Sequence, residues 1–502
     1  MGWTVRLDVY RPLEKTRPMI ISFLHTFWPL LVAGFTLLLS LATAGHAIIY
    51  KRDSRAAVGW VGLIWLAPLI GSILYILLGI NRVRRRVSGM RGDERQHLIE
   101  LKTFACSPGS ILDHLGPDEK HLAEMARMNE RLSGMALLKG NRIEPLLNGD
   151  EAYPAMCQAI DQSTASLTLT SYIFDNDRVG QRFVAALNRA VQRGVEVRVL
   201  IDAVGARYSI PPVIHRLRMA GVRVARFMPN YLPWSTPYIN LRSHRKLLVA
   251  DGRLAFTGGM NIRADHVLGD APRYPTLDTH FQVTGPVVHE LQATFAEDWL
   301  FTTGERLQGD LWFAPPENAG PVLARALPDG PDKDYDKMRK SFHGALSVAE
   351  RSVFIVTPYF LPDASLISAI NSCALRGVDV DILLPSKNNL KLVAWASMAQ
   401  MWQLLEWGCR VWMAPPPFDH SKLLVVDGAW TLIGSPNWDA RSLRLNFELA
   451  LEGYDTAFAK RIQEIIQEKM KGAHPLTLDE VNSRPLPVQL RDGAARLLSP
   501  YL

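Results

Sequence analysis

An octapeptide motif occurs twice in this chain, and the repeat restricts the fold more than any other feature of the sequence. The first copy is His244-Arg-Lys-Leu-Leu-Val-Ala-Asp251, which Gly258-Gly-Met-Asn261 follows. The second copy is His420-Ser-Lys-Leu-Leu-Val-Val-Asp427, which Gly434-Ser-Pro-Asn437 follows. His, Lys, Asp, Gly and Asn have the same spacing in both copies, which lie 176 residues apart. Five matched positions at this separation indicate an internal duplication.

The same order of strands and helices precedes each motif. The predicted strand, helix and strand are 166–174, 181–193 and 195–201 in the first half, and 352–360, 365–376 and 378–384 in the second. Strands joined by a single helix predict parallel βαβ units. Each motif then has an Asp-Gly pair between apolar residues, which predicts a β-hairpin. We therefore expect an α/β fold with two lobes, related by pseudo-twofold symmetry, that share one active site.

Each motif contributes one histidine and one lysine to this expected site. Residues two apart in a strand point to the same face, so His244 and Lys246 are expected to project together, as are His420 and Lys422. Two imidazoles and two ammonium groups would surround one phosphodiester. One histidine can attack phosphorus and form a phosphohistidine, while the other protonates the leaving alkoxide and then deprotonates the incoming nucleophile. This chemistry requires no metal or other cofactor.

The remaining motif residues are expected to anchor the hairpins and to bind phosphoryl oxygens. Asp251 and Asp427 fall in the turns, an odd number of residues after the histidines, so their side chains are expected to point to the opposite face of the strand. This favours an anchoring role within the catalytic motif. Asn261 and Asn437 can donate amide hydrogens to the charge that develops on phosphate oxygens in the transition state.

Two acidic residues are candidates for orienting the histidines. Asp278 follows His244 by 34 residues, and Glu448 follows His420 by 28 residues on an apolar, strand-like segment. A carboxylate beside an imidazole determines its tautomer and supports its positive charge. The alternative for each acid is a solvated side chain at the end of a strand.

Two apolar runs without charged residues precede the repeated halves, at 18–50 and 56–81. Each is longer than the roughly 20 residues with which a helix crosses a bilayer. We place the spans at about 29–50 and 56–80; the alternative is two buried helices of a soluble domain. Lys and Arg are more frequent before the first run and after the second, including 82–86, than in the loop between them. This distribution favours both ends in the cytoplasm.

These features predict five consecutive regions. They are a membrane hairpin at 1–92, a connector with a short helix at 93–143, the first lobe at 144–306, a linker at 307–334, and the second lobe with a C-terminal tail at 335–502.

Composition excludes several classes of protein. The net charge is +7, but residues 1–92 hold 12 Lys and Arg against 3 Asp and Glu, so the rest of the chain is slightly acidic. A nucleic-acid-binding protein usually carries its basic residues on the folded body, so we expect no nucleic-acid partner. The four cysteines form no Cys-x-x-Cys pair and are expected to be reduced thiols.

The duplicated motif resembles the signature of the phospholipase D superfamily, His-x-Lys-x4-Asp-x6-Gly-(Gly/Ser)-x-Asn. The whole chain is similar to the bacterial cardiolipin synthases within that superfamily. The stretches that carry this second resemblance are 75–86, Asn148-Gly-Asp-Glu, Ser171-Tyr-Ile-Phe-Asp, Arg441-Ser-Leu-Arg-Leu-Asn-Phe-Glu448 and the C-terminal Ala-Arg-Leu-Leu-Ser-Pro-Tyr-Leu. One departure concerns Asp278, because Thr276-Leu277 stand where the family usually has Trp-Arg.

The resemblance implies a multi-pass enzyme of the bacterial inner membrane with its catalytic body in the cytoplasm. Its substrate would be phosphatidylglycerol, and the reaction would transfer a phosphatidyl group from one molecule to a second, giving cardiolipin and glycerol. By likeness to the family, His244 is the nucleophile and His420 the acid and base. A phospholipase D-type hydrolase, or transfer to another head-group alcohol, is the alternative. The oligomeric state is left open.

Three other stretches invite a functional interpretation. The aromatic and proline-rich stretch at 231–239 either enters the bilayer or packs over the site. Apolar residues at 395–407 have helical spacing and predict a core helix rather than a membrane surface. Basic residues at 387–391 either approach the acceptor phosphate or belong to a solvated loop.

Overall fold

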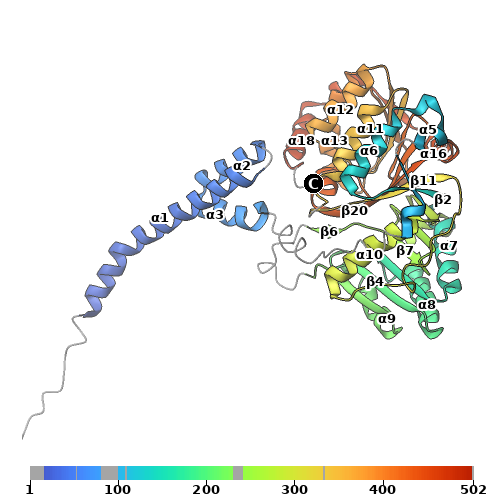
Figure 1. Ribbon diagram of the computed structural model, residues 1–502. Helices are drawn as coiled ribbons and strands as arrows, with labels where there is room; N and C mark the ends of the chain where they lie inside the picture. Colours follow the sequence, from blue (N-terminus) through green and yellow to red (C-terminus); the bar gives the residue numbers. More distant parts are fainter. Residues whose placement is uncertain are drawn as a thin grey trace, which may run out of the picture. The chain divides into compact units, whose positions relative to one another are not determined.

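The computed structural model describes most of the chain (Figure 1). The described residues are 16–51, 54–80, 100–107, 110–229, 241–331 and 334–499. They form two units, an N-terminal group of helices and an α/β body, and each is considered by itself. The stretches 82–86 and 231–239, for which functions were predicted, lie outside the described residues.

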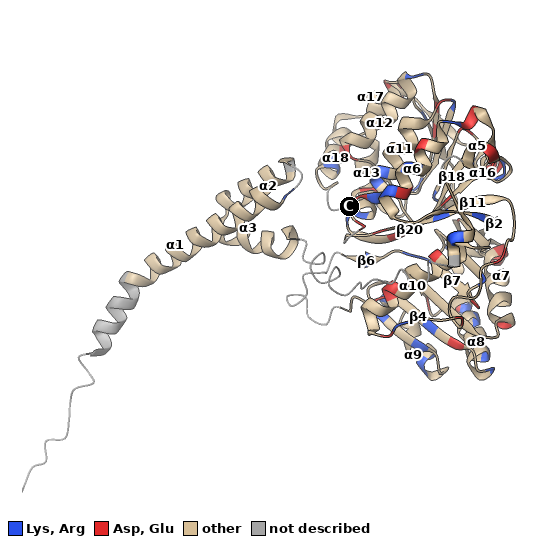
Figure 2. Ribbon diagram, viewed as in Figure 1, with Lys and Arg blue, Asp and Glu red and all other residues tan. Residues whose placement is uncertain are grey.

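The N-terminal unit begins with the long helix α1, Thr16–Tyr50. Its part Phe27–Tyr50 is long and apolar enough to cross a membrane. Only 17% of its most apolar window is buried, which argues against the core helix of a soluble domain. Figure 2 shows that the described parts of the N-terminal helices carry almost no charged residues, whereas the body carries many.

The expected continuous span at 56–80 is instead broken into shorter helices. Helix α2, Ser54–Leu66, ends just before α3, Pro68–Leu74, and a π-helical turn, Tyr75–Gly79, follows. The proline lacks an N–H and its ring clashes with a helical carbonyl, so α2 cannot continue. Helix α3 then packs closely on α2, since a Cβ on Gly71 would lie 2.4 Å from the Leu63 carbonyl oxygen. With 13 residues, α2 extends only about 20 Å.

The first half of the body has the predicted βαβ unit and hairpin. Strand β3, Ser166–Ser171, is joined through helix α8, Arg178–Gln192, to the parallel strand β4, Glu196–Asp202. Strand β7, Leu247–Ala250, pairs antiparallel with both β3 and β8, Leu254–Gly258. β3 ends three residues earlier than predicted.

The second half repeats this arrangement. Strand β12, Ser352–Val356, is joined through helix α12, Ala364–Leu375, to the parallel strand β14, Asp379–Pro385. Strand β17, Leu423–Val426, pairs antiparallel with β12 and with β18, Trp430–Gly434. β12 is shorter than the predicted strand because a Thr-Pro pair follows it, and proline cannot donate to a sheet ladder.

The two halves are joined by strands that lie between them in Figure 1. Strand β2, Leu137–Leu147, pairs with β10, Thr279–Thr284, through residues 142–147 and with β11, Val322–Asp329, through residues 138–141. Strand β11 also pairs with β20, Asn446–Tyr454, through residues 323–329. The segment at 307–334, expected to be a linker, therefore contributes a buried strand to the junction.

A hydrophobic core crosses this junction and holds the halves together. It contains side chains of both halves, among them Phe281 and Phe458, whose ring centroids lie 6.4 Å apart. Phe227 and Phe447 form a second such pair at 5.1 Å. Because aromatic side chains bury large apolar areas, these contacts favour one fixed arrangement of the two lobes.

A buried ion pair attaches the connector helix α6, Leu122–Ser133, to the same junction. Arg325 Nε donates to Glu452 at 2.6 Å, and Arg325 also donates to the carbonyl oxygen of Ala126 at 2.9 Å. Asn129 Nδ2, on α6, donates to the second oxygen of Glu452 at 2.6 Å. Removing one partner would leave the other charge buried without compensation.

Arg325→Met is therefore expected to lower the free energy of unfolding by about 3–5 kcal/mol. The exposed pair Arg189–Asp161 is the matched control, and Arg189→Met is expected to cost about 1 kcal/mol or less. Thermal unfolding of the detergent-solubilised protein measures both. Equal effects of the two substitutions would contradict the importance of the buried pair.

Candidate active site

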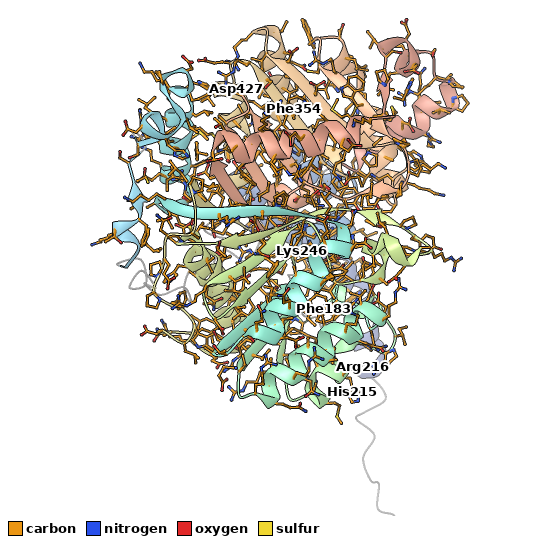
Figure 3. All side chains as sticks on the ribbon, turned by 90° about the vertical axis from the view of Figure 1, so that its right-hand side faces the viewer. Phe183, His215, Arg216, Lys246, Phe354 and Asp427 are labelled. Atoms are coloured by element: carbon orange, nitrogen blue, oxygen red, sulfur yellow. The ribbon has the colours of Figure 1, made fainter. Side chains whose placement is uncertain are left out.

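Two very short strands deliver the motif histidines to the junction between the halves. Strand β6, Arg242–Ser243, precedes His244 and pairs in parallel with β20 of the second half. The His244 N–H donates to the carbonyl oxygen of Phe447 at 2.9 Å. Figure 3 shows the neighbouring Lys246 at the level where the two halves meet.

The second histidine is delivered in the same way with the halves exchanged. Strand β16, Phe418–Asp419, precedes His420 and pairs in parallel with β9, Thr276–Leu277, of the first half. The His420 N–H donates to the carbonyl oxygen of Leu277 at 2.8 Å. The two motifs are therefore related by the same local geometry, as pseudo-twofold symmetry requires.

The imidazole rings contact carboxylates of the opposite half. His244 Nδ1 lies 3.0 Å from Glu448, and His420 Nδ1 lies 2.9 Å from Asp278. Both acids are completely buried, so neither is a solvated side chain at a strand end. The acid that follows each motif in the sequence thus serves the histidine of the other motif.

The surroundings of Glu448 favour its ionised form. Ser435 Oγ and Ser442 Oγ donate to it at 2.5 and 2.6 Å, and Asn446 Nδ2 donates at 3.1 Å. Burial acts to raise the pKa of Glu448, but His244, Lys246 and the Ser435 hydroxyl bring that pKa below its ordinary value.

Asp278 has fewer donors than Glu448. Within the described residues, the only other hydrogen bond to its carboxylate comes from the backbone N–H of Thr279, at 2.8 Å. Burial raises the pKa of Asp278 above its ordinary value. The two histidines consequently have different electrostatic support.

One motif position explains part of this asymmetry. Ser435 donates to Glu448 in the second half, and Gly259 is its counterpart in the first half. A Cβ on Gly259 would lie 2.8 Å from Asp278 Oδ1 and 3.1 Å from the carbonyl oxygen of His420. The backbone approaches Asp278 so closely here that no side chain fits without displacement.

The two lysines are held against the backbone of their own motifs. Lys246 Nζ donates to the carbonyl oxygen of His244 at 2.6 Å, and Lys422 Nζ donates to that of His420 at 2.5 Å. We expected the alternation of side chains in a strand to place each His and Lys on the same face. In both motifs, however, the residues from His to Lys lie between two strands, so this alternation does not apply to them. The two lysines are buried.

Burial and mutual repulsion lower the pKa values of the basic groups. Burial lowers the pKa of Lys246 well below its ordinary range and that of Lys422 to about 8. Burial also lowers the pKa of His244 to about 4, and burial with the two lysines lowers the pKa of His420 well below its ordinary value. These groups lie close enough to repel one another, which requires the two motifs to share one site.

The motif aspartates anchor the hairpins away from the histidines. Asp251 accepts from the backbone N–H groups of residues 164–166, at the start of β3. Asp427 accepts from those of residues 350–352, before and at the start of β12, and contacts His121 Nε2 at 2.7 Å. Both residues have positive φ angles, +52° and +54°. The expected anchoring contacts are therefore present.

The two asparagines differ in their hydrogen bonds. Asn261 Oδ1 accepts from the backbone N–H of Ile173 at 3.1 Å. Asn437 has a buried Oδ1 without a hydrogen-bond partner in the described part of the chain, while its backbone N–H donates to Ser442 Oγ at 2.8 Å. These contacts hold the asparagine positions next to each motif, and their binding of phosphoryl oxygens remains a prediction.

Two tyrosines that the sequence reasoning missed border the histidines. The ring of Tyr172 lies 5.5 Å from that of His244, and the ring of Tyr359 lies 6.1 Å from that of His420. They follow corresponding strands, β3 and β12, so aligning the two halves could have found them. Burial raises the pKa of Tyr172 and of Tyr359 above its ordinary value.

A third histidine near the site was also missed. The ring of His266 lies 6.4 Å from that of His420, and burial lowers its pKa to about 3. No spacing rule in the sequence singles out this residue. Among the described residues, no group of three or more His, Cys, Asp or Glu side chains could hold a metal ion.

The duplicated lobes and their paired His-Lys motifs define a protein of the phospholipase D superfamily. Residues 156–299 and 343–470 match the family model described as cardiolipin synthase, PLD-like domain, and residues 38–79 match the phospholipase D-nuclease N-terminal model. The chain belongs to the cardiolipin synthase family, whose members are phosphatidyltransferases.

Curated relatives match over nearly their whole length. The chain is 31% identical to the major cardiolipin synthase ClsA of Bacillus subtilis, over 91% of this chain and 96% of that protein. It is 32% identical to cardiolipin synthase A of Pseudomonas fluorescens, over 95% of this chain and 99% of the relative.

A solved structure shows the same fold. The phosphatidylserine synthase of Haemophilus influenzae superposes with a TM-score of 0.60 at 16% sequence identity, covering 76% of this chain and all of that one. At this identity the likeness concerns the fold alone.

Gly259→Ala is expected to lower phosphatidyl transfer by about 100-fold, because the added methyl displaces Asp278 from His420. Gly259 does not have a positive φ, so the backbone itself tolerates alanine. Ser435→Ala, at the corresponding position, removes one of several donors to Glu448 and is expected to cost about tenfold or less. Initial rates of the two variants, with thermal unfolding as a check on folding, measure this difference. An unchanged rate of phosphatidyl transfer in Gly259→Ala would contradict the close packing of Gly259 against Asp278.

Proposed function

We propose that this protein transfers a phosphatidyl group from one phosphatidylglycerol to a second, which yields cardiolipin and glycerol. The observation that carries the proposal is the crossed pairing of two histidines with two buried carboxylates, because it joins both motifs into one phosphodiester site. The names of the full-length relatives support the choice of lipid.

The proposed nucleophile is His244, by likeness to the family. Its Nδ1 faces Glu448, so Nε2 is the ring nitrogen available for attack on phosphorus. The low pKa of His244 leaves Nε2 unprotonated at neutral pH, as a nucleophile requires. Ionised Glu448 then stabilises the positive charge that the ring acquires when the N–P bond forms.

His420 is the proposed general acid and base. In the first step His244 Nε2 bonds to phosphorus and the glycerol oxygen leaves with a proton from His420. In the second step the hydroxyl of another phosphatidylglycerol gives its proton to His420 and attacks phosphorus, and the bond to His244 breaks. Overall the reaction is ping-pong, through a phosphatidyl-histidine.

The lysines support both steps. Lys246 and Lys422 would contact the non-bridging oxygens, where negative charge builds up in the transition state. Asn261 and Asn437 would donate to the same oxygens. An anionic phosphodiester between the lysines also raises the pKa of His420, opposing the effect of burial, so substrate favours the protonated acid.

Purified protein incubated with phosphatidylglycerol alone is expected to produce cardiolipin and free glycerol in equal amounts. His244→Ala and His420→Ala are each expected to lower the rate by at least about 1,000-fold, because the groups act as a unit. Thin-layer chromatography and glycerol assay measure the products. Phosphatidic acid as the main product would instead identify a hydrolase, and full activity of either variant would refute the shared site.

The rate should also depend on pH through Lys422. Its pKa of about 8 means that the ammonium form predominates below pH 8 and is lost above it. Because kcat/KM reports the free enzyme, in which the pKa of His420 is already well below its ordinary value, kcat/KM is expected to fall more steeply as pH rises through about 8. Lys422→Arg should move this limb to higher pH, since a guanidinium stays protonated. A limb that the substitution does not move would refute the assignment.

We also infer that the body lies in the cytoplasm of a bacterial inner membrane. If α2 and α3 together form a second membrane span, the loop between the two spans has fewer Lys and Arg than the segments outside them. If α1 is the single span, the segment between α1 and the body has more Lys and Arg than the segment before α1. The positive-inside rule therefore gives the same side for the body in both multi-pass and single-pass arrangements. A reporter fused to the C-terminus tests this, and a periplasmic signal would refute it.

A further inference from the structure

Helix α18, Leu486–Leu497, has an exposed apolar stripe. Leu486, Leu490 and Leu497 are 66%, 65% and 78% exposed. At roughly 100° per residue these three positions lie within about 40° of one another on the helix surface. A helix on the surface of a soluble protein normally directs such a stripe toward its core.

The core-facing side of α18 is occupied by other residues. Asp492 and Ala495 are almost fully buried, and Ala495 packs with Ala396 and Leu361 in a small apolar cluster. Ala396 belongs to helix α13, Lys391–Met398, which α18 contacts directly. The leucine stripe is on the opposite side of α18 and takes no part in this packing.

Basic residues border the stripe. Arg491 and Arg496 are exposed and lie on either side of the leucine stripe, about 100–120° around the helix from its centre. The one acidic residue of α18, Asp492, is buried and accepts from both Arg484 and Arg491, so it leaves a net positive charge. Leucines flanked by arginines are typical of a helix that lies in the interface of an anionic membrane.

Two further exposed leucines lie beside the wall of the active site. Leu390 and Leu392, at the start of α13, are 48% and 45% exposed. The neighbouring Asn389 accepts from the hydroxyl of Tyr359 at 2.9 Å, and Tyr359 borders His420. A short path therefore leads from exposed leucines to the general acid and base.

We propose that α18, with the segment 390–392, is a membrane-docking face that seats the body on an anionic phospholipid bilayer. The leucines insert among the acyl chains, and Arg491, Arg496 and Lys391 contact lipid phosphates. This rests on the proposed function, because a two-tailed substrate and product must pass between bilayer and site. Docking at 390–392 brings the head group toward Tyr359 and His420 while the tails stay in the membrane.

A fluorophore on Leu490→Cys reports this contact directly. The full-length protein, with Cys106→Ser and Cys157→Ser to remove the two cysteines that are not buried, is placed in phosphatidylglycerol-containing nanodiscs. Lipids with nitroxide on the acyl chains should quench this label several-fold more than a label on Met219→Cys, which is 77% exposed on helix α9, Val213–Met219. This readout needs no enzymatic activity, so it stays informative if the proposed function fails.

Equal quenching at the two positions overturns the proposal. That result includes the cases in which a second copy of the chain or the N-terminal helices cover α18 in place of lipid. Strong quenching at position 490 alone, lost when neutral lipid replaces phosphatidylglycerol, supports both the apolar and the electrostatic part.

Kinetics provide the second test. The triple variant Leu486→Ser, Leu490→Ser and Leu497→Ser is expected to lose about tenfold in transfer rate on vesicles. Its rate on monomeric dihexanoyl phosphatidylglycerol should stay within about twofold, because no bilayer is involved. Leu375→Ser, on the exposed end of α12, is the matched control and should change neither rate. Equal losses on both substrates would show a folding effect and refute docking.

Discussion

The hydrogen bonds between each motif histidine and a carboxylate of the opposite half are the interactions on which the rest of the body depends. Glu448 and Asp278 are completely buried, and a buried carboxylate without a partner is costly. The two halves must therefore dock closely for either acid to be satisfied. The apolar core across the junction and the strand pairing of β11 with β2 and β20 supply that docking. Neither half contains a complete site.

Duplication produced two motifs of the same design, but their surroundings differ. Glu448 accepts three side-chain hydrogen bonds besides that of His244, and its pKa is lowered, whereas the pKa of Asp278 is raised. An ionised partner would suit a ring that carries positive charge in the proposed covalent intermediate. One matched motif position contributes to this difference. Ser435 has a hydroxyl that donates to Glu448, whereas Gly259 has no side chain and its backbone lies close to Asp278. Symmetric sequence motifs can thus take non-equivalent chemical roles.

Two structurally different parts of the chain are suited to contact lipid. Helix α1 has the length and composition of a spanning segment, while α18 exposes leucines between arginines on the body itself. A spanning helix keeps the enzyme at the membrane, but it does not orient the catalytic lobes. An interfacial face next to Tyr359 would provide that orientation, so that the substrate phosphate reaches the site without complete extraction of its acyl chains.

Local patterns in the sequence determined the motif residues, the βαβ units and the Asp-Gly hairpins, because these depend on periodicity and turn chemistry within short segments. Tertiary structure alone decided that Glu448 serves His244, 204 residues away, since that contact exists only after the halves dock. It likewise decided that 307–334 contributes strand β11 and that Tyr172 and Tyr359 border the histidines. The proline at position 68 indicates the end of α2 from the sequence alone. The packing of α3 against α2, by contrast, depends on the close contact between Gly71 and the backbone of Leu63. The spacing of residues along the chain does not determine such contacts, because they depend on how distant segments pack against one another.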